Sequence, residues 1–252
     1  MTTGNKVGLL DGDVLLYEIT FSCEEAWNWG NDLWTLHGDF KQASQRLDCW
    51  ISNLKEKLGL DGLEIALTCR EGNWRNEIYP DYKANRKSKR KPILFPKLRE
   101  YLEDTYSVVQ IKNLEADDVL GILATSNSSN DYIIVTIDKD LLTVPGYHYN
   151  YAKDTEDAAY VWKVTKEQAD YNHLLQTITG DPVDNYPGCP GIGKVRGARV
   201  LDESPTWSTV VKLYEKAGLT EEDALVQARV ARILRADEFD MKTQTVKYWS
   251  PE

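Results

Sequence analysis

The sequence predicts an α/β protein in which a mostly parallel central sheet is flanked by helices and followed by a smaller helical part. Short apolar runs typical of buried strands alternate with amphipathic helical segments over residues 1–165. From residue 166 onward the pattern is helical and is interrupted by a turn rich in Gly and Pro. The length of 252 residues suits one large core with a helical appendage.

The first part of the chain alternates between two hydrophobic periods. Apolar runs predict strands, which fall at residues 7–10, 63–68, 107–111, 132–137 and 146–151. Apolar residues recurring every three or four positions predict helices, which fall at residues 14–27, 40–58, 98–105 and 115–125. The last of these helices opens with acids, as a helix N-terminus favours. Such alternation implies a sheet that is covered on both faces.

The second part of the chain contains no comparable strand pattern. Helical spacing predicts four helices, at residues 166–179, 193–201, 206–217 and 221–236. We therefore divide the chain into an α/β core at 1–165 and a helical subdomain at 166–252, docked together as one compact unit.

Four acidic clusters recur along the chain, and the first three adjoin predicted strands. They are Asp11-Gly12-Asp13, Glu115-Ala116-Asp117-Asp118, Asp138-Lys139-Asp140 and Gly180-Asp181-Pro182-Val183-Asp184-Asn185. Because sites in parallel sheets form outside the carboxyl ends of the strands, Asp11, Glu115 and Asp138 are expected to converge. Gathered carboxylates raise one another's pKa unless a cation neutralises them, so the pattern predicts a divalent-metal site.

The spacing within the clusters indicates which carboxylates can act together. Glu115 and Asp118 share one helical face, whereas Asp117 points elsewhere unless the helix begins after it. Asp138 and Asp140 face the same side of an extended backbone. Acids at 115–118 taken alone are better explained as helix capping, but four such elements favour catalysis. Two Mg²⁺ ions held by oxygen ligands would orient a scissile phosphate, generate hydroxide and stabilise the leaving 3′ oxygen.

A basic segment lies in the middle of this acidic chain, whose formal net charge is -10. Residues 83–99, KANRKSKRKPILFPKLR, carry eight Lys or Arg and no acid. Such a run fits an element that contacts phosphates, and a solvated basic loop or a localisation-like tract would look the same. A second candidate is the turn at 188–194, where glycines let backbone approach a phosphate at a helix start. A tight interhelical turn is the alternative there.

Other classes of protein are disfavoured by composition. The four cysteines are widely separated and the three histidines are isolated, so neither a zinc site nor a disulfide framework is indicated. No signal peptide or run of about 18 apolar residues is present, and we expect a reduced, cytoplasmic protein without membrane contact.

The motifs taken together resemble the flap endonuclease and 5′ nuclease superfamily. Asp-Gly after the first strand, YKANR, EADDVLG, TIDKDL and GDPVDNYPGCPGIG occur in the family's order and approximate spacing. The motifs LDGD, NWRNE, YKANRK, HLLQTITGD, GLTEED and VARILR make the chain more similar to the 5′ to 3′ exonucleases of the bacteriophage T-seven type (podovirus). The resemblance covers about residues 7–249.

The resemblance implies a PIN/5′-nuclease-like fold and a metal site. The positions that match the family's acidic ligands are Asp11, Glu115, Asp117, Asp118, Asp138, Asp140, Asp181 and Asp184. Asp13 belongs to the phage version of the first motif. The resemblance also implies catalytic roles at the reacting phosphate for Lys83, Arg86, Asp11, Asp138 and Asp140.

The same resemblance implies how DNA is held. Residues 79–105 match a helical arch past which the 5′ end runs, and Gly191 and Gly193 match a helix-three-turn-helix that grips the duplex backbone, often with bound K⁺. The implied DNA contacts are Tyr82, Lys83, Arg86, Lys87, Lys89, Arg90, Lys91, Gly191, Gly193, Lys194 and Arg196.

One position departs from the family. Many relatives carry a metal-site Asp at the end of the second strand, where this chain has Thr68 or, with a one-residue shift, Cys69. Glu71 is a weak substitute. The departure puts the geometry of one metal ion in doubt.

Aromatic residues are candidates for stacking on unpaired bases. We expect at least two of Trp27, Trp29 and Trp34 to pack in the core or to cover the sheet. Tyr79 and Tyr82, beside the basic segment, are the better stacking candidates.

The predicted function is a divalent-metal-dependent 5′ to 3′ exonuclease on double-stranded DNA, with flap endonuclease and RNase H-like activity, for phage primer removal and DNA degradation. Mg²⁺ is the expected metal, and Mn²⁺ can substitute. The expected partners are DNA with 5′ ends or flaps, RNA·DNA hybrids and replication proteins, with the enzyme a monomer in the host cytoplasm. The alternatives are a flap endonuclease without strong exonuclease activity and a catalytically weak DNA-junction binding protein.

Overall fold

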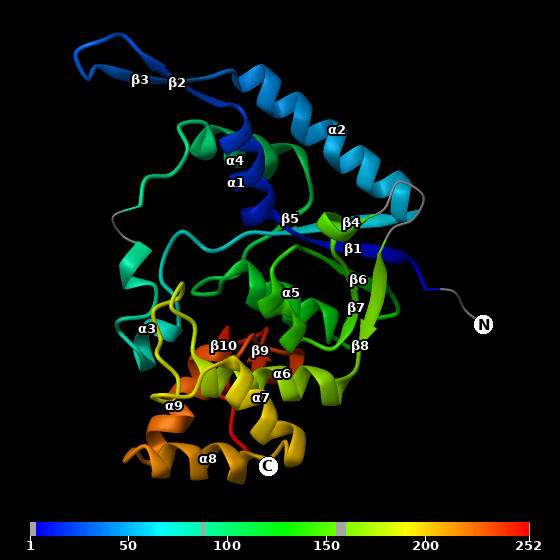
Figure 1. The fold of residues 1–252 in the computed structure, drawn as a ribbon. Coiled ribbons are helices and arrows are strands. Elements are labelled where there is room, and N and C mark those ends of the chain that lie inside the picture. The colour runs from blue at the N-terminus through cyan, green and yellow to red at the C-terminus, as the bar shows by residue number, and fades with distance from the viewer. Residues whose placement is uncertain (1–3, 87–88, 155–159, 252) are drawn as a thin grey trace.

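A six-stranded sheet forms the centre of the protein in this computed structural model, which describes residues 4–86, 89–154 and 160–251 (Figure 1). The strand order is β5-β4-β1-β6-β7-β8. The parallel strands are β1 (Lys6–Asp11), β4 (Gly62–Ala66), β5 (Val108–Val109), β6 (Asp131–Val135) and β7 (Gly146–Tyr149). The edge strand β8 (Val161–Val164) pairs antiparallel with β7 and was not predicted from the sequence. The predicted mostly parallel sheet is confirmed.

Helices cover both faces of the sheet, because its strands are apolar on both sides. On one face α1 (Gly12–Ser22), α2 (Phe40–Leu58) and α4 (Phe95–Thr105) enclose a buried cluster that includes Leu10 and Leu47. On the other face α5 (Ala116–Ala124) packs with Ile134 and Leu9. The N-cap of α5 is Glu115, as the acid-rich start predicts.

The helical part of the chain lies below the sheet in Figure 1 and has a hydrophobic cluster of its own. It contains α6 (Lys166–Thr179), α7 (Lys194–Glu203), α8 (Trp207–Lys216) and α9 (Glu221–Ala231). After α9 the chain returns to the sheet, because Ile233, Leu234 and Phe239 are buried in the same cluster as α5. The two parts are therefore joined by buried contacts as well as by the chain.

Short elements complete the fold. They are the 3₁₀ turns η1 (Ala84–Arg86), η2 (Lys139–Thr143), η3 (Tyr151–Lys153) and η4 (Ala236–Glu238), the helix α3 (Arg75–Ile78), and the antiparallel pair β9 (Phe239–Asp240) and β10 (Thr245–Val246). Within the described ranges, no helix is both long and apolar enough to cross a membrane.

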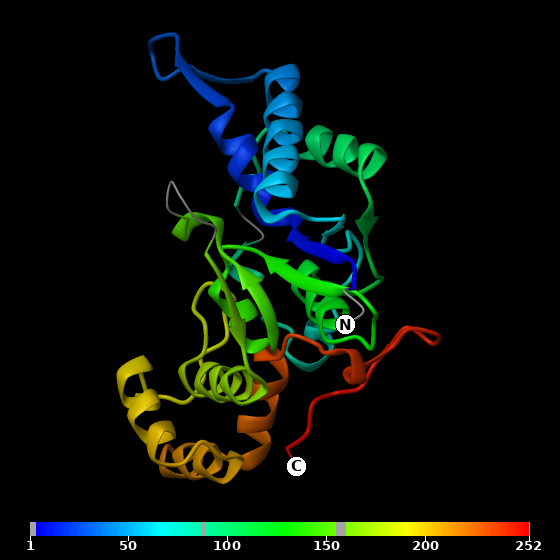
Figure 2. The ribbon, with the colours of Figure 1, turned by 90° about the vertical axis from the view of Figure 1, so that its right-hand side faces the viewer.

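The helix predicted at 14–27 is wrong beyond residue 22. Helix α1 ends at Ser22, and the chain continues as a hairpin of β2 (Glu24–Asn28) and β3 (Trp34–Gly38) that projects from the body of the molecule (Figures 1 and 2). The turn holds Gly30, Asn31 and Asp32 at positive φ, which these residue types tolerate best. This turn chemistry and the β-favouring tryptophans outweigh the helical spacing of the apolar residues.

The basic segment forms an irregular connection between α3 and α4. Its described residues before Phe95 contain one short helical turn, η1, instead of the long helix expected of an arch. Like charges cannot form favourable i,i+4 pairs, and Pro92 and Pro96 restrict helix to the region that begins at Phe95. Lys87 lies outside the described residues.

Candidate active site

Four segments that are distant in the sequence meet at the carboxyl edge of the sheet. Asp11 ends β1, and its carboxylate accepts hydrogen bonds from Val14 N at 3.1 Å and from Thr136 Oγ1 at 3.0 Å. The same Thr136 hydroxyl accepts from Asp138 N at 3.0 Å. The carboxylate of Asp138 in turn accepts from Asp140 N at 2.9 Å. The end of β1 is thus fixed to the segment that follows β6, as the parallel-sheet rule predicts.

Thr68, the position that departs from the family, joins the remaining segments of this edge. Its backbone N donates to Asp13 Oδ2 at 2.9 Å, and its Oγ1 accepts from Ala116 N at 3.0 Å. Its carbonyl accepts from Arg99 Nη2 at 2.7 Å. Asp13 therefore brings a carboxylate to the backbone of the residue where many relatives have their own Asp, and Thr68 acts here as a hydrogen-bonding link.

Three carboxylates at this edge face other carboxylates. Burial, together with the neighbouring Asp13, raises the pKa of Asp11 to about 7. Burial and the charges of Asp11 and Asp138 raise the pKa of Asp117 well above its usual range. Burial and Asp138 likewise raise the pKa of Asp140 to about 7. These groups lie where a positive charge would relieve their repulsion.

The neighbouring carboxylates of Glu115 and Asp184 already have cationic partners. Lys83 Nζ bonds Glu115 Oε1 and lies 3.5 Å from Asp184 Oδ2, and Arg86 Nη2 bonds Asp184 Oδ1. The hydroxyl of Tyr82 donates to both acids, at 2.8 and 3.0 Å. Burial opposes the charge of Glu115, but Lys83 and Arg75 outweigh it and lower its pKa to about 2.

Asp118 belongs to a fully buried ion pair with Arg75. Its two oxygens accept from Arg75 Nη1 and Nη2 at 2.7 and 2.8 Å, and Oδ2 also accepts from Trp74 Nε1 at 3.0 Å. Arg75 additionally donates to the carbonyls of Val230 and Arg232. The carboxylate of Asp118 is therefore enclosed by donors and ties α5 to the end of α9.

A small cavity of about 20 Å³ lies among these groups, with Asp117, Asp140 and Asp184 in its lining. Gln176 also lines it, and the buried Oε1 of Gln176 has no hydrogen-bond partner in the structure. Oxygen atoms of this kind are the ligands that hard divalent cations prefer. As they stand, no three His, Cys, Asp or Glu side chains of the described ranges form a ready metal-binding group. Lys83 and Arg86 occupy two of the carboxylates, those of Glu115 and Asp184.

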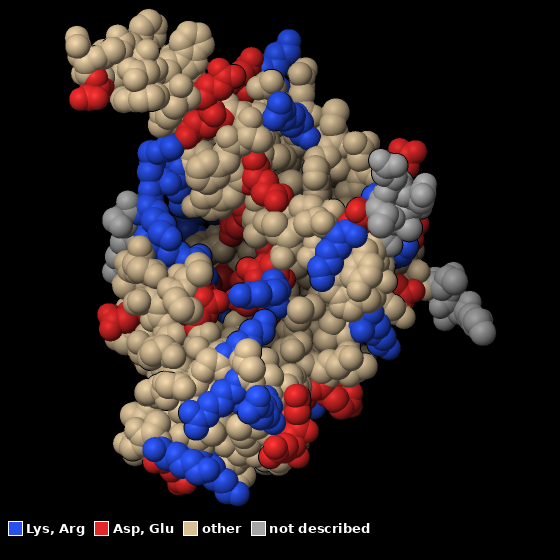
Figure 3. Space-filling view, in the orientation of Figure 1, with Lys and Arg blue, Asp and Glu red and all other residues tan. Residues whose placement is uncertain are grey.

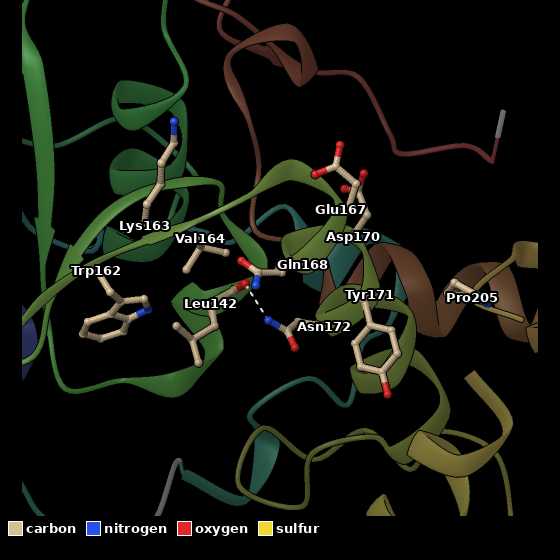
Figure 4. A pocket seen from close by; sticks show the side chains of 10 residues that line it. All are labelled: Leu142, Trp162, Lys163, Val164, Glu167, Gln168, Asp170, Tyr171, Asn172 and Pro205. Carbon is tan, nitrogen blue, oxygen red and sulfur yellow. Dashed lines mark hydrogen bonds between the residues drawn. The ribbon is translucent and has the colours of Figure 1, made fainter. Parts of the chain in front are cut away.

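A larger cavity of about 770 Å³ lies elsewhere, between β8 and α6 (Figure 4). Its lining includes Trp162, Val164, Tyr171 and Pro205, and none of the predicted site residues. Asn172 reaches across it to the carbonyl of Leu142 at 2.9 Å. This cavity is separate from the carboxylate centre.

The structure brings most of the predicted acids together, but only some of them are paired with cations. Asp11, Asp117, Asp138 and Asp140 share the edge described above, and the charge of Asp181 contributes to the raised pKa of Asp140. Figure 3 shows acidic side chains in a hollow at the centre of one face, with Lys and Arg along its margin.

The predicted DNA contacts outside this centre are solvent-exposed. They lie on the basic segment and at the start of α7, and they are Lys89, Arg90, Lys91, Gly191, Gly193, Lys194 and Arg196. Gly191 has a φ of 72°, which a side chain would strain, and Gly193 is the N-cap of α7.

The expectations for Tyr82 and for the tryptophans are wrong, whereas Tyr79 is half-buried. Tyr82 is only 5% exposed and its hydroxyl is engaged with two acids, so its ring is not available to stack on a base. Trp27, Trp29 and Trp34 are instead 53%, 62% and 58% exposed on the hairpin. The cause is the hairpin itself, which carries these residues away from the core.

Sequence reasoning missed the residues that organise the site. Arg75 was noticed only within NWRNE, and Thr136 and Gln176 were not singled out. An Arg beside Trp74 and outside the basic segment was the one available signal for a buried ion pair. Nothing local in the sequence marks Gln176, because its position beside the acids depends on how α6 packs.

Comparisons with known proteins identify a family, related sequences and a similar fold. Residues 6–171 match the family model described as 5′-3′ exonuclease, N-terminal resolvase-like domain. The chain is 29% identical to the exodeoxyribonuclease of Enterobacteria phage T3, over 96% of this chain and 92% of that protein. It is also 29% identical to the exonuclease of Escherichia phage T7, over 96% of this chain and 93% of that protein.

Among solved structures, the fold is similar to that of the bacteriophage T5 flap endonuclease in a complex with DNA and metal ions. The TM-score is 0.68 at 16% sequence identity, covering 90% of this chain and 88% of that one. At this identity the likeness concerns the fold.

Proposed function

The chain belongs to the family of 5′-3′ exonucleases with an N-terminal resolvase-like domain, and we propose that it hydrolyses phosphodiester bonds from the 5′ ends of double-stranded DNA. Its relatives include phage exonucleases and a flap endonuclease, and we propose that this chain is a metal-dependent nuclease of the same type. The observation that carries the proposal is the set of unneutralised carboxylates, Asp11, Asp117 and Asp140, at the carboxyl edge of the sheet.

We infer that these carboxylates fit divalent cations. The repulsion among them, the small cavity that Asp117 and Asp140 line and the unpartnered oxygen of Gln176 all favour a hard cation with oxygen ligands. The proposed ligands are the acids predicted from the motifs, with Asp13 supplying the carboxylate that Thr68 lacks: Asp11, Asp13, Glu115, Asp117, Asp138, Asp140, Asp181 and Asp184. We propose Mg²⁺ as the metal, with Mn²⁺ able to replace it. Bound there, it would supply an activated water and neutralise charge on the leaving oxygen.

We propose that Asp118 serves this site indirectly. Its oxygens are held by Arg75 and Trp74, so it supports the start of α5, from which Glu115 and Asp117 project. The same Arg75 contacts Glu115 Oε2 at 3.1 Å and orients that carboxylate.

The cations of the site have a part of their own in the proposed reaction. Lys83 and Arg86 lie at the carboxylates that a substrate phosphate would approach. When the phosphate binds, the N–H groups of Lys83 and Arg86 leave these carboxylates and donate to the phosphate oxygens instead. This exchange holds the phosphate and frees Glu115 and Asp184 as metal ligands. Tyr82 keeps both acids in place during this exchange through its hydroxyl.

We propose that the duplex is held by the exposed cations and glycines described above. The turn before α7 acts in this proposal as a helix-three-turn-helix that binds the backbone with K⁺, and the segment at 79–105 guides the 5′ end. Residues 1–165 and 166–252 then form the nuclease core and the DNA-binding subdomain. Flaps and RNA·DNA hybrids are further proposed substrates, for a monomer that removes primers beside replication proteins in the host cytoplasm.

A cleavage assay tests this function. Duplex DNA labelled separately at its 5′ and 3′ ends is incubated with and without Mg²⁺, with wild type, Asp138→Asn and the matched control Asp131→Asn. Asp131 is exposed at the opposite end of β6, so its substitution should be silent. Early release of the 5′ label, abolished by EDTA or by Asp138→Asn, supports the proposal.

The same assay with a 5′-flapped duplex added, and with binding measured in parallel, separates the alternatives. Cleavage of flaps without attack on blunt ends indicates a flap endonuclease. Binding without cleavage in either Mg²⁺ or Mn²⁺ indicates a junction-binding protein and overturns the proposal.

A further inference from the structure

The β2–β3 hairpin carries large apolar side chains that the fold does not bury. Trp27, Trp29, Leu33 and Trp34 are each more than half exposed. A two-stranded hairpin has no core of its own, and such side chains lower the solubility of a protein unless they meet a partner. The hairpin extends from the molecule in both ribbon views, clear of the sheet and its helices (Figures 1 and 2).

Two of the tryptophans share one face of this hairpin. Trp27 is on β2, and Trp29 follows directly after the end of this strand. Their ring centroids are 6.3 Å apart with an interplanar angle of 30°. Their indole N–H groups are held, by Glu25 at 3.3 Å and by Thr35 Oγ1 at 2.8 Å. The rings are therefore oriented by hydrogen bonds at their edges. Trp27 also packs against His37, whose ring centroid is 5.6 Å away at an interplanar angle of 63°, and both tryptophans remain more than half exposed.

The base of the hairpin is fastened to the basic segment. Arg90 donates to both oxygens of Glu24, at 2.9 and 2.6 Å, and Ile93 N donates to Glu24 Oε2 at 2.8 Å. A Cβ added at Gly38 would lie 2.8 Å from Leu94, so the two segments are also in close contact. In Figure 3 the basic side chains occupy the surface between the hairpin and the acidic hollow.

The charges favour one kind of occupant. The surface that leads to the hairpin is cationic, whereas residues 24–39 contain four acids and no Lys or Arg. Two of these acids are engaged, Glu24 with Arg90 and Asp39 as the N-cap of α2. A ligand suited to both surfaces carries negative charge along its backbone and flat, uncharged groups beside it. Unpaired nucleic acid has this chemistry, since its phosphates follow cations and its bases stack on aromatic rings.

We propose that the hairpin is a docking surface for an unpaired 5′ strand, which runs from the carboxylate site over the basic segment and stacks its bases on Trp27 and Trp29. This inference rests on the proposed function, because it assigns a path to one strand of the substrate of that site. It explains why the hairpin is tied to the basic segment through Glu24.

Binding in EDTA tests the inference without cleavage. The probe is a duplex labelled at its far end, either blunt or with a 5′ tail of ten thymidines or the same tail at the 3′ end, and affinity is read by fluorescence anisotropy. The variants are Trp27→Ala/Trp29→Ala and, as a matched control, Tyr147→Ala, which removes an aromatic ring of similar exposure from β7. Circular dichroism and thermal melting establish that each variant is folded.

The wild type should bind the 5′-tailed duplex about tenfold or more tighter than the blunt one, and the double variant should lose most of this gain. Tyr147→Ala should retain it. Should the alanine variant fold poorly, Trp27→Leu/Trp29→Leu keeps the apolar bulk and removes the extended ring system, and the same loss is expected.

Two results would overturn the inference. One is a 5′-tail gain that is absent in the wild type or unchanged in the double variant. The other is a self-associated wild type that becomes monomeric in the tryptophan variants on sedimentation, which makes the hairpin a contact between copies of this chain. Failure of the nuclease proposal is seen separately, as absence of cleavage in Mg²⁺ or Mn²⁺.

Discussion

Two groups of carboxylates lie at the carboxyl edge of the sheet, one paired with cations and the other facing further acids. Glu115 and Asp118 are bonded by Arg75, Lys83 and Tyr82, and the pKa of Glu115 falls to about 2. Asp11 and Asp140 face other acids, and burial with that repulsion raises the pKa of each to about 7. Asp117, from the same EADD motif as Glu115 and Asp118, belongs to the second group, because burial and the charges of Asp11 and Asp138 raise its pKa. The number of acids in a motif therefore exceeds the number that are free to bind a cation.

The difference between the two groups should be largest when the buried Arg75–Asp118 ion pair is removed. Arg75→Met leaves Asp118 charged and without its bidentate partner, so the free energy of unfolding should fall by about 3–5 kcal/mol. Chemical denaturation measures this. The control is Arg70→Met, because Arg70 pairs with Glu103 at the exposed surface and its loss should cost less than about 1 kcal/mol. Equal losses in the two variants would contradict a special role for the Arg75–Asp118 pair.

A substitution in the other group should reduce activity strongly and change stability little. Asp117→Asn removes a half-buried acid that faces Asp11 and Asp138, so stability in EDTA should stay within about 1 kcal/mol of wild type or rise. Mg²⁺-dependent cleavage should fall by at least about a hundredfold, equivalent to roughly 2.7 kcal/mol of transition-state stabilisation. Denaturation and initial rates, measured beside Asp131→Asn, check both. A large loss of stability with normal cleavage would place Asp117 in the framework.

Bound metal should stabilise the protein through the second group of carboxylates. If the unneutralised acids are the ligands, Mg²⁺ at about a hundred times its dissociation constant should stabilise the wild type by roughly 2.7 kcal/mol. Thermal melts in Mg²⁺ and in EDTA measure the gain, which should shrink in Asp117→Asn and persist in Asp131→Asn. An identical gain in Asp117→Asn would assign the binding to another part of the molecule.

The pH dependence of stability gives the smallest effect. The pKa of Asp11 is about 7 in the folded state against 3.8 for the free group, so the folded protein holds a proton over this interval that the unfolded chain releases. In EDTA the stability of the wild type should therefore decline as pH rises from about 4 to about 7.

Asp11→Asn cannot lose this proton and keeps an oxygen that can accept from Val14 N. Its stability relative to wild type should increase by roughly 1 kcal/mol per pH unit between pH 5 and pH 7. Urea denaturation at several pH values measures the difference. A constant difference across this range would show that Asp11 does not titrate as its burial implies.

Local pattern was sufficient for most of the sheet and for the placement of the acids. The strands before Asp11 and Asp138 are short apolar runs, and parallel strands bring their carboxyl ends to one edge whatever their separation in the sequence. The helix at 14–27 failed because periodicity over a short window cannot distinguish the end of a helix from the start of a hairpin. The turn residues Gly30 and Asn31 were the local signal that should have had more weight.

Some features of the protein follow from its sequence alone, and three others follow only from its tertiary structure. The sequence by itself determined the fold class, the acid-rich edge and a cationic segment, because each follows from residue type and spacing. Packing alone decided that Arg75 pairs with Asp118, that Tyr82 is buried while Trp27 is exposed, and that Gln176 lines the acid centre. The Arg75–Asp118 contact, for example, joins residues that are 43 positions apart. No local pattern records such neighbours, although burial and neighbouring charges set the pKa of a side chain.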